Sequence, residues 1–367
     1  MKLFVSFSVL LAVASFVFVT QGCAHSSCSP GVKYFRYQNP ISNGIDPNGV
    51  RDCQIFRDGG KWYMVATSWP VWDNNICPNP GVRIYSSDTL TEWKNEGLLI
   101  DRKKLAPNVW YLDRFWAPEI HKINGKYYLT FNARNETPQY KTWHGTGVAV
   151  SNKLMGPYTI LTPNAPFSYG NDITLFQDSD GKVYAYWNGD HVIVGAQVDM
   201  AQMKPIVDSN GQPTVAFRST AGTWDSIGIE GPYVIKRGST YYMFYSSWTR
   251  GYEIGYATSN SPLGPWTKYA GNPIYGSQNR EACKASGLPY TGDPNSLFVA
   301  VGHNQIFTGY DGRYWLSCHG TTGQGKDMLV IDPIDFDEQG NIKVKKPTYT
   351  PQEIRLPDKK SGNVRCD

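Results

Sequence analysis

The feature that most constrains the fold of this chain of 367 residues is an internal repeat. Five segments share one layout, in which a short apolar stretch, a glycine turn and an aromatic-rich stretch follow one another. The turn glycines are Gly59, Gly125, Gly181, Gly238 and Gly312. Asp-Gly and Asn-Gly pairs at several of these turns supply the positive φ that a tight hairpin needs. Such a repeat, without alternating helices, predicts an all-β fold, a five-bladed β-propeller.

The composition agrees with a globular protein and excludes one class of partner. Hydrophobic residues make up 41% of the chain and charged residues 18%, which is typical of a folded domain. The net charge of +4 is small and the charges are interspersed, so we expect no nucleic-acid partner. Aromatic residues reach 14%, enough to fill strand cores and also to line a cleft that stacks on sugars.

The N-terminus has the pattern of an export signal. Lys2 is followed by a nearly pure apolar run over residues 3–19, and Cys23 stands where a lipidated cysteine would stand. We predict a signal peptide of lipoprotein type at 1–22, a tether at 23–35 and a catalytic propeller at 36–367. The protein would be exported as a periplasmic or cell-surface lipoprotein, with plain secretion as the alternative. A second apolar run is missing, so we expect a possible lipid anchor but no transmembrane segment.

Six further cysteines agree with an oxidising compartment. An even number of cysteines in an exported chain suggests disulfides. The sequence does not choose among the pairings; Cys53–Cys77 and Cys28–Cys366 are two candidates, and the second would tie the chain ends together.

Ionisable residues recur near the start of the repeated segments. In a propeller the innermost strands line one axis, so these positions would form a ring of Asp52, Glu119, Asp172, Glu230 and His303. Burial and like charge raise the pKa of some grouped carboxyls. A protonated carboxyl beside an ionised one is what glycosidic cleavage needs. Capping of strand starts or binding of a structural cation is the alternative role for such residues.

The motifs around these residues match one known family. They are Asp52, the stretch Trp116-Ala117-Pro118-Glu119, Asp172 ahead of Phe176 and Asp178-Ser179-Asp180-Gly181, the stretch Glu230-Gly231-Pro232, and Gly302-His303. The layout resembles glycoside hydrolase family 43, five-bladed propellers that hydrolyse arabinosides, xylosides and some galactosides. The resemblance covers about residues 36–350. Cys53 stands where the family usually has proline after the base.

The resemblance implies a role for each ring residue. Asp52 would be the general base, Glu230 the general acid, and Asp172 would tune the pKa of the acid and orient it. Cleavage would be inverting, with the two carboxyls roughly 6.5–9.5 Å apart to admit a water. No cofactor would be required, although relatives often hold a calcium ion or water at the centre, so His303 is a possible calcium contact through water.

Substrate contacts are predicted from residues near the ring. They are Trp116, Phe115, Trp69 and Trp248 for stacking, Asn171 and Arg280 for hydroxyl groups, and Glu119 and His303 on the axis. Long loops favour action on a terminal sugar of an oligosaccharide or polysaccharide. We expect the protein to be a monomer. An α-L-arabinofuranoside is the first choice, and a β-D-galactofuranoside or β-xyloside is the alternative.

Three other interpretations stay open at this stage. A non-catalytic carbohydrate-binding propeller would have the same repeat without the chemistry. A sialidase-like propeller would need repeated Asp boxes and an arginine cluster, of which only a degenerate box at residues 86–93 is present. An invertase-like enzyme would share the architecture but use a covalent Asp nucleophile.

Overall fold

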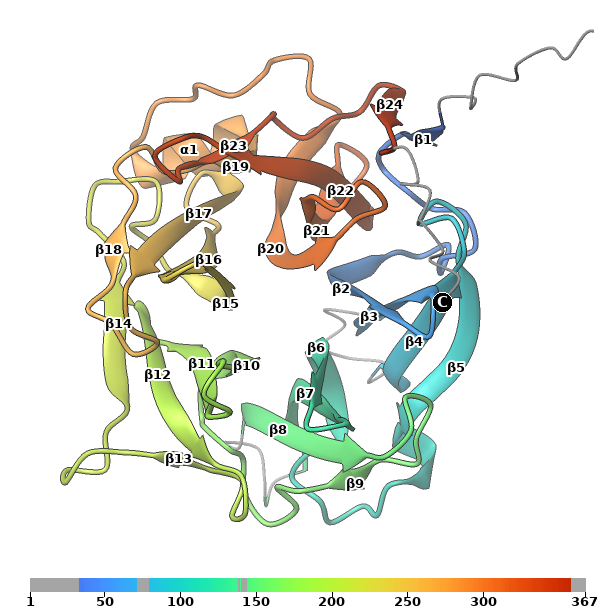
Figure 1. Cartoon of the computed structure of the whole chain (residues 1–367), viewed down its shortest axis with the longest axis vertical. Helices are drawn as coiled ribbons and strands as arrows, with labels where there is room; N and C mark the ends of the chain where they lie inside the picture. The colour runs from blue at the N-terminus through green and yellow to red at the C-terminus, as the bar shows by residue number, and fades with distance from the viewer. Residues whose placement is uncertain (1–32, 71–78, 138, 140–143, 358–367) are drawn as a thin grey trace, which may run out of the picture.

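A computed structural model describes residues 33–70, 79–137, 139 and 144–357. Five antiparallel sheets surround one axis, and the first strand of each sheet lies nearest that axis (Figure 1). The predicted all-β, five-bladed propeller is confirmed. The blades follow one another in chain order, so each repeated segment of the sequence forms the two inner strands of one blade.

Each blade is a meander that runs from the axis to the outer edge. Blade I is β2 (Val50–Asp58), β3 (Lys61–Ser68), β4 (Gly81–Ser87) and β5 (Lys94–Asp101). Blade II is β6 (Asp113–Ile123), β7 (Lys126–Arg134), β8 (His144–Ser151) and β9 (Thr159–Ile160). Blade III is β10 (Asn171–Gln177), β11 (Val183–Gly189), β12 (Val192–Asp199), β13 (Lys204–Ile206) and β14 (Thr214–Arg218). Blade IV is β15 (Glu230–Arg237), β16 (Thr240–Ser247), β17 (Gly251–Ser259), β18 (Thr267–Lys268) and β19 (Tyr275–Gln278). Blade V is β20 (Phe298–Thr308), β21 (Tyr314–Thr322), β22 (Asp327–Phe336) and β23 (Ile342–Val344).

A small extra sheet joins the two ends of the described chain. Strand β1 (Tyr34–Tyr37) pairs antiparallel with β24 (Gln352–Arg355) beside the junction of blades I and V (Figure 1). Helical structure in the described residues is confined to the turn η1 (Arg102–Lys104) and the short helix α1 (Arg280–Ser286). The pairing of β1 with β24 fastens the last blade to the start of the first.

The inner strand of every blade contains a bulge with a left-handed residue. The residues with positive φ are Asp52 (53°), Ala117 (42°), Asp172 (56°), Gly231 (60°) and His303 (56°), and the strand register shifts beside each of them. A bulge bends the strand and re-aims the side chains beside it. Non-glycine residues adopt this conformation at a cost, which a functional position can justify.

The bulges correct the predicted ring. Asp52, Asp172 and His303 occupy equivalent positions, but Glu230 stands one position before its bulge residue, Gly231. Glu119 stands two positions after Ala117, which makes it equivalent to Gln54 and places it one layer further along the axis. The predicted ring is therefore displaced by two residues at Glu119 in blade II and by one residue at Glu230 in blade IV.

Hydrogen bonds between neighbouring blades hold the bulges in place. In four junctions a side chain on the second strand of one blade accepts the bulge N–H of the next: Thr67 from Ala117 (2.7 Å), Asn132 from Asp172 (2.8 Å), Ser246 from His303 (2.9 Å) and His319 Nδ1 from Asp52 (3.2 Å). At the fifth junction the Gly231 N–H is accepted by Asp172 Oδ2 (3.1 Å). The ring of bulges is thus a single network that passes through two of the predicted catalytic residues.

The opposite ends of the blades are joined by ionic contacts and aromatic packing. Asp58 in blade I accepts hydrogen bonds from Lys122 (2.7 Å) and Tyr127 (2.9 Å) in blade II. Asp178 repeats this contact with Lys236 (2.6 Å) and Tyr241 across blades III and IV. Between blades V and I the cores interlock through aromatic rings such as Trp62 and Phe307. The two ring centroids lie 5.6 Å apart in an edge-to-face arrangement, which is favourable for aromatic pairs.

The cysteine prediction fails where it can be examined. Cys53, Cys283 and Cys318 are free, buried thiols, so the expected Cys53–Cys77 bond is wrong. The sequence could not show that Cys53 lies in the apolar core of blade I, where it packs as a small hydrophobic residue. Cys77, the Cys28–Cys366 pair, the signal peptide and the lipidated Cys23 lie outside the described residues. Within those residues the structure contains no helix long and apolar enough to cross a membrane.

Candidate active site

A cavity of about 220 Å³ opens at the axis where the bulges meet, and we refer to it as the central cavity. Its walls are the paired positions at and before each bulge: Arg51 and Asp52, Trp116 and Ala117, Asn171 and Asp172, Glu230, and His303. Three residues of blade II, Asn132, Arg134 and His144, complete it. Because a bulge lets two successive residues face the same side of the strand, blades I, II and III each contribute two adjacent residues to the cavity, whereas blades IV and V contribute Glu230 and His303 alone.

Asp52 is surrounded by positive charge and hydrogen-bond donors. Its Oδ1 lies 3.3 Å from His303 Nδ1 and 3.5 Å from His319 Nδ1, and its Oδ2 accepts a hydrogen bond from Thr67 at 2.5 Å. Burial would raise the pKa of Asp52, but the charge of His303, the adjacent His319 ring, the charge of Arg51 and the Thr67 hydrogen bond lower it to about 2. Asp52 is therefore a carboxylate at any pH at which the protein would act.

His319 contributes to this site mainly through its hydrogen bond. Burial and the neighbouring Arg51 lower its pKa well below the usual value, so the ring is neutral. Since Nδ1 accepts the Asp52 N–H, the ring proton of His319 belongs on Nε2. His319 holds the backbone of Asp52 in its left-handed conformation rather than neutralising its charge.

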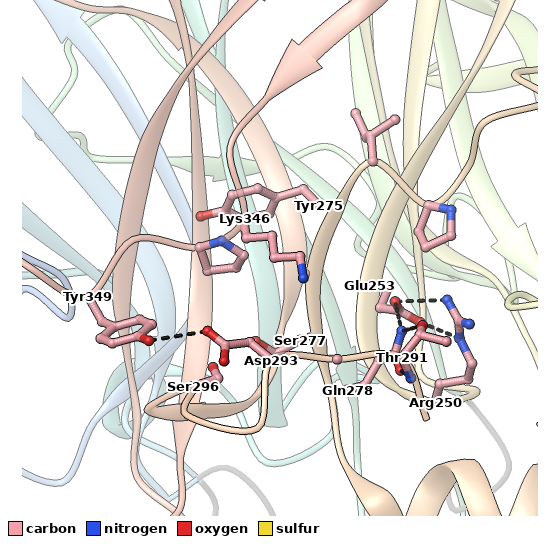
Figure 2. A pocket seen from close by; sticks show the side chains of 15 residues that line it. Arg250, Glu253, Tyr275, Ser277, Gln278, Thr291, Asp293, Ser296, Lys346 and Tyr349 are labelled. Atoms are coloured by element: carbon pink, nitrogen blue, oxygen red, sulfur yellow. Dashed lines mark hydrogen bonds and ion pairs between the residues drawn. The ribbon is translucent and has the colours of Figure 1, made fainter. Parts of the chain in front are cut away.

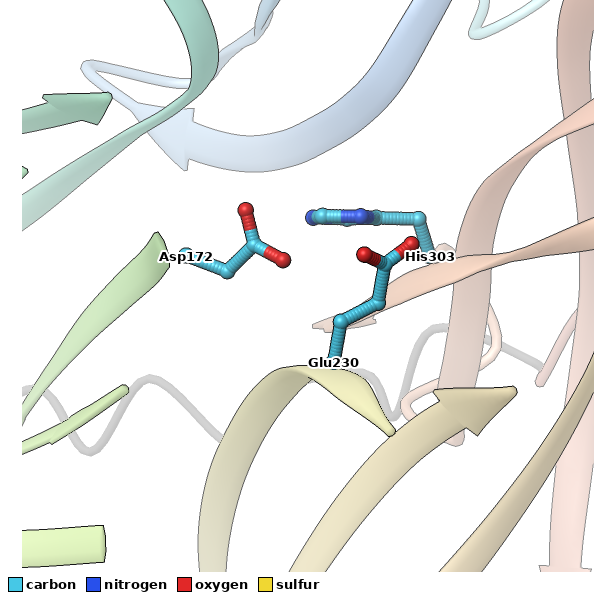
Figure 3. A group of neighbouring side chains, drawn as sticks. All are labelled: Asp172, Glu230 and His303. Atoms are coloured by element: carbon cyan, nitrogen blue, oxygen red, sulfur yellow. The ribbon is translucent and has the colours of Figure 1, made fainter. Parts of the chain in front are cut away.

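The second carboxyl group, Glu230, lies beside Asp172 and His303. Figure 3 shows the three side chains converging from blades III, IV and V, and their ligating atoms lie within 4.8 Å of one another. The Tyr252 hydroxyl donates to Glu230 Oε1. Burial raises the pKa of Tyr252, so it stays a donor, and the acidic proton of Glu230 is left to Oε2.

Glu230 is the group that holds a proton. Burial, and then the charge of Asp172, raise its pKa to about 7. The pKa of Asp172 is also raised by burial, but its carboxylate accepts hydrogen bonds from Asn132 (2.7 Å), the Gly231 N–H (3.1 Å) and the Asn188 amide (3.1 Å). Three donors stabilise the anion, so we assign the shared proton to Glu230. The site thus contains one buried anion and one half-buried acid.

His303 occupies the centre of the ring as a counter-ion. Burial would lower its pKa, but Asp52, Asp172, Glu230 and Glu119 raise it. A protonated imidazole cannot ligate a metal, because a ligand nitrogen must be neutral. Calcium also prefers oxygen ligands. A calcium ion would therefore bind the carboxyl oxygens of Asp172 and Glu230, which lie within 4.8 Å of a ring nitrogen of His303, and would contact His303 through water. Calcium at this place stays a prediction.

The structure places three of the predicted contact residues at or beside the central cavity. Trp116 and Asn171 line the central cavity, and Trp248 lies at its edge with 42% of its surface exposed. Asn171 Oδ1 and His144 Nε2 are buried and have no partner among the described residues, so they are free to bind hydroxyl groups.

The structure places four predicted contact residues outside the lining of the central cavity. Phe115 is 1% exposed and packs against Phe131 in the core of blade II, because the strand directs it away from the axis when it directs Trp116 inward. Glu119 lies in the next layer of the channel, bonded to Gln305 (3.2 Å) and His121 (2.8 Å). Arg280 begins helix α1, where it lies over the Tyr290 ring (4.2 Å). Trp69 is half exposed after β3 and is not among the lining residues.

A different cavity lies between the outer parts of blades IV and V. It has a volume of about 250 Å³ and contains Arg250, whose guanidinium makes a bidentate contact with Glu253 at 2.8 and 3.0 Å (Figure 2). Tyr349 and Asp293 form a second contact across it (3.2 Å). Arg250 is thus paired with Glu253 in this cavity and lies apart from the central site.

Sequence reasoning missed several residues that line the central cavity or contact Glu230. Arg51, Arg134, His144 and Tyr252 were not predicted. Arg51 could have been found, because it precedes Asp52 as Trp116 precedes Ala117 and Glu230 precedes Gly231. The other three lie on second and third strands, where the repeat gives no signal for proximity to the axis.

A buried carboxylate and a half-buried carboxylic acid at the axis of a five-bladed propeller define the class of acid–base glycosidases. The sequence matches the family model for glycosyl hydrolases family 43 over residues 37–342, and the chain belongs to that family.

Similar curated proteins act on several sugars. The chain is 23% identical over 337 residues to a non-reducing end alpha-L-arabinofuranosidase of Bacteroides ovatus, covering 88% of this chain and 56% of that protein. It is 26% identical to a xylan 1,3-beta-xylosidase of a Vibrio species, and the match covers 68% of this chain and 45% of that protein. It is 24% identical to a beta-D-galactofuranosidase of Aspergillus niger, covering 70% and 72%. The chain spans about half the length of the first two of these relatives.

Solved structures share the fold. A crystal structure of a thermostable family-43 glycoside hydrolase superposes with a TM-score of 0.67 at 28% identity, covering 88% of this chain and 99% of that one. An endo-1,4-beta-xylanase of Bacteroides thetaiotaomicron superposes with a TM-score of 0.63 at 24% identity, covering 85% and 99%. Identity at this level supports the architecture and leaves the sugar open.

Proposed function

We propose that this protein is an inverting glycoside hydrolase that releases a terminal sugar, with Asp52 as base, Glu230 as acid and Asp172 as the residue that keeps Glu230 protonated. The observation that carries the proposal is the opposite shift of two carboxyls at one cavity. The pKa of Asp52 is lowered to about 2 and that of Glu230 is raised to about 7.

The reaction proceeds in one displacement. Glu230 Oε2 gives its proton to the glycosidic oxygen as the bond from that oxygen to the anomeric carbon breaks. Asp52 accepts a proton from a water whose oxygen forms the new bond to the anomeric carbon on the opposite face. The products are a free sugar of inverted configuration and a free hydroxyl on the leaving part. Proton exchange with solvent then restores both carboxyls.

The terminal sugar is proposed to be α-L-arabinofuranose, with β-D-galactofuranose and β-xylose as alternatives. The names of the similar proteins support this range of sugars. The small central cavity has room for one sugar ring, the Trp116 face offers a stacking surface, and Asn171 and His144 offer unpaired polar atoms. A cavity with room for one unit supports exo-action.

A panel of nitrophenyl furanosides and pyranosides tests the proposal. We expect release of nitrophenol from one of them and, by NMR, a product of inverted anomeric configuration. Retention would point to a covalent nucleophile, as in the invertase-like alternative. Glu230→Gln should abolish hydrolysis of substrates with poor leaving groups while sparing sugar affinity. A protein that binds the sugars but hydrolyses none of the panel would be the non-catalytic propeller.

A further inference from the structure

Three cavities meet at Glu230. Besides the central cavity, Glu230 lines one of about 400 Å³ towards blades V and I and one of about 280 Å³ towards blade III. We call the first the Arg51 lobe; it is lined by Arg51, Glu230, Trp248, Gly251, Tyr252, Ala300, His319 and Thr321. We call the second the Tyr169 lobe; it includes His144, Tyr169, Asn171, Asn188, Asp190, His191, Ile227, Glu230 and Trp248.

Trp248 forms the boundary between the two lobes. It lines both of them and exposes 42% of its surface. Its ring packs on Gly228, where an added Cβ would lie 2.5 Å from the indole, so the ring is seated against bare backbone. We call the place where the two lobes diverge at Trp248 the fork. A fixed, half-exposed indole at this place offers a stacking surface for a sugar ring whose neighbouring units extend to both sides.

Both lobes have the chemistry of sugar subsites. The Tyr169 lobe has two exposed apolar side chains, Tyr169 (65% exposed) and Ile227 (44%), beside polar groups. In the Arg51 lobe, His319 Nε2 is buried and has no partner among the described residues. Since the ring proton of His319 belongs on Nε2, this atom is a donor that a hydroxyl group can satisfy.

The fork restricts which leaving part fits. The unit that carries the leaving oxygen must lie beside Glu230, since Glu230 gives that oxygen its proton. A linear chain attached through its end continues from that unit in one direction, whereas an internal unit of a backbone continues in two. Two lobes on either side of Trp248 match the second case.

We infer that the enzyme removes a single sugar carried as a branch on an internal unit of a polysaccharide backbone, which would lie across Trp248 through both lobes. This inference rests on the proposed function. It names the leaving part of the substrate, which the sugar in the central cavity does not determine.

The test compares branched and linear substrates with the full chain. The released sugar is first fixed with the nitrophenyl panel. Oligosaccharides that carry this sugar on an internal backbone unit, on a terminal backbone unit or at the end of a linear chain are then compared by kcat/KM. We expect the internally branched compound to exceed the linear one by about 10-fold or more. Equal rates, or a preference for the linear compound, would overturn the inference.

Two variants connect the preference to the lobes. Trp248→Ala should lower kcat/KM for the internally branched compound by about 10-fold more than it lowers kcat/KM for the nitrophenyl glycoside. Ala300→Trp should fill the Arg51 lobe and lower the rate for the internal branch more than for the terminal one. Tyr34→Ala, which removes an exposed aromatic residue of β1, is the matched control. Wild-type preference in both lobe variants would also overturn the inference, whereas loss of all nitrophenyl activity in the wild type would instead refute the proposed function.

Discussion

The surroundings of Asp52 and of Glu230 differ in one respect that decides their chemistry. Both carboxyls lie at the same end of one channel, Asp52 buried and Glu230 half-buried, and burial alone would raise the pKa of each. Asp52 faces His303, His319 and Arg51, whereas Glu230 faces the carboxyl of Asp172. Charge in the immediate neighbourhood, rather than depth, therefore separates an anion from an acid.

The comparison also indicates what the low pKa of Asp52 is for. A general base is most effective when its pKa lies near the working pH, and a pKa of about 2 makes Asp52 an intrinsically weak base. In the proposed mechanism its neighbours would instead keep Asp52 negatively charged beside the anomeric carbon, where positive charge develops. Thr67 and His319 fix its position for the water.

Removing either carboxyl gives the largest expected effect, and the two losses should differ in kind. Asp52→Asn should lower kcat by about 10³–10⁴-fold on every substrate, because the water loses its base whatever the leaving group is. Glu230→Gln should cost a similar factor with sugar leaving groups but much less with dinitrophenol, which leaves without a proton. Rates for a series of aryl glycosides of decreasing leaving-group pKa measure the difference.

The contrast would fail if both variants depended on the leaving group in the same way. Tyr34→Ala serves as the control for expression and folding, since Tyr34 is an exposed residue of the β1–β24 sheet. Circular dichroism spectra of the three variants should superpose on that of the wild type.

Asp172→Asn should remove the like charge that distinguishes the two surroundings. The charge of Asp172 raises the pKa of Glu230, so its removal lowers that pKa, and the basic limb of the kcat/KM profile should move from near pH 7 to lower pH. Because Asp172 also accepts the Gly231 N–H, misplacement of Glu230 should lower kcat by about 10²-fold. A full pH profile of the variant measures both effects; a basic limb at unchanged pH would show that Asp172 does not act on Glu230 electrostatically.

Much of the architecture could be predicted because the propeller is a repeat. Five similar segments each form one blade, and the wheel brings Asp52, Asp172 and Glu230 together although they lie far apart in the chain. The position of each side chain on its strand could not be read in the same way. A bulge changes the alternation of inward and outward residues, which is why Phe115 was expected at the cavity and is in the core.

The residues that tune the site were out of reach for a different reason. Tyr252, His319 and Thr67 act through contacts between strands and between blades, and these contacts depend on register. A free thiol at Cys53 likewise follows from the position of that residue in the core. A sequence repeat gives the order of the strands but does not give these lateral neighbours.

His319→Ala should test the support of Asp52 by the preceding blade. The change leaves the buried Asp52 N–H without an acceptor and creates a cavity, so we expect a loss of about 2–4 kcal/mol in the free energy of unfolding. His319→Asn should recover part of this loss, because Asn132 accepts the equivalent N–H of Asp172 at 2.8 Å in blade II. Urea unfolding at fixed pH compares the variants; equal losses for Ala and Asn would contradict the role of the acceptor.

Thr67→Val gives the smallest expected effect and tests the hydrogen bond that the Thr67 hydroxyl donates to Asp52. The Thr67 hydroxyl donates to Asp52 Oδ2 and accepts the Ala117 N–H, so both contacts disappear while the side-chain volume is kept. A hydrogen bond to the anion lowers its pKa, and its loss should raise the pKa of Asp52 by less than about one unit, equivalent to about 1 kcal/mol. The acidic limb of the pH profile of kcat/KM should therefore move slightly to higher pH, and the basic limb should stay where the pKa of Glu230 places it.

Thr67→Ser keeps the hydroxyl and should leave both limbs unchanged. Movement of the basic limb in Thr67→Val would mean that the two carboxyls titrate as one coupled system rather than in two separate surroundings.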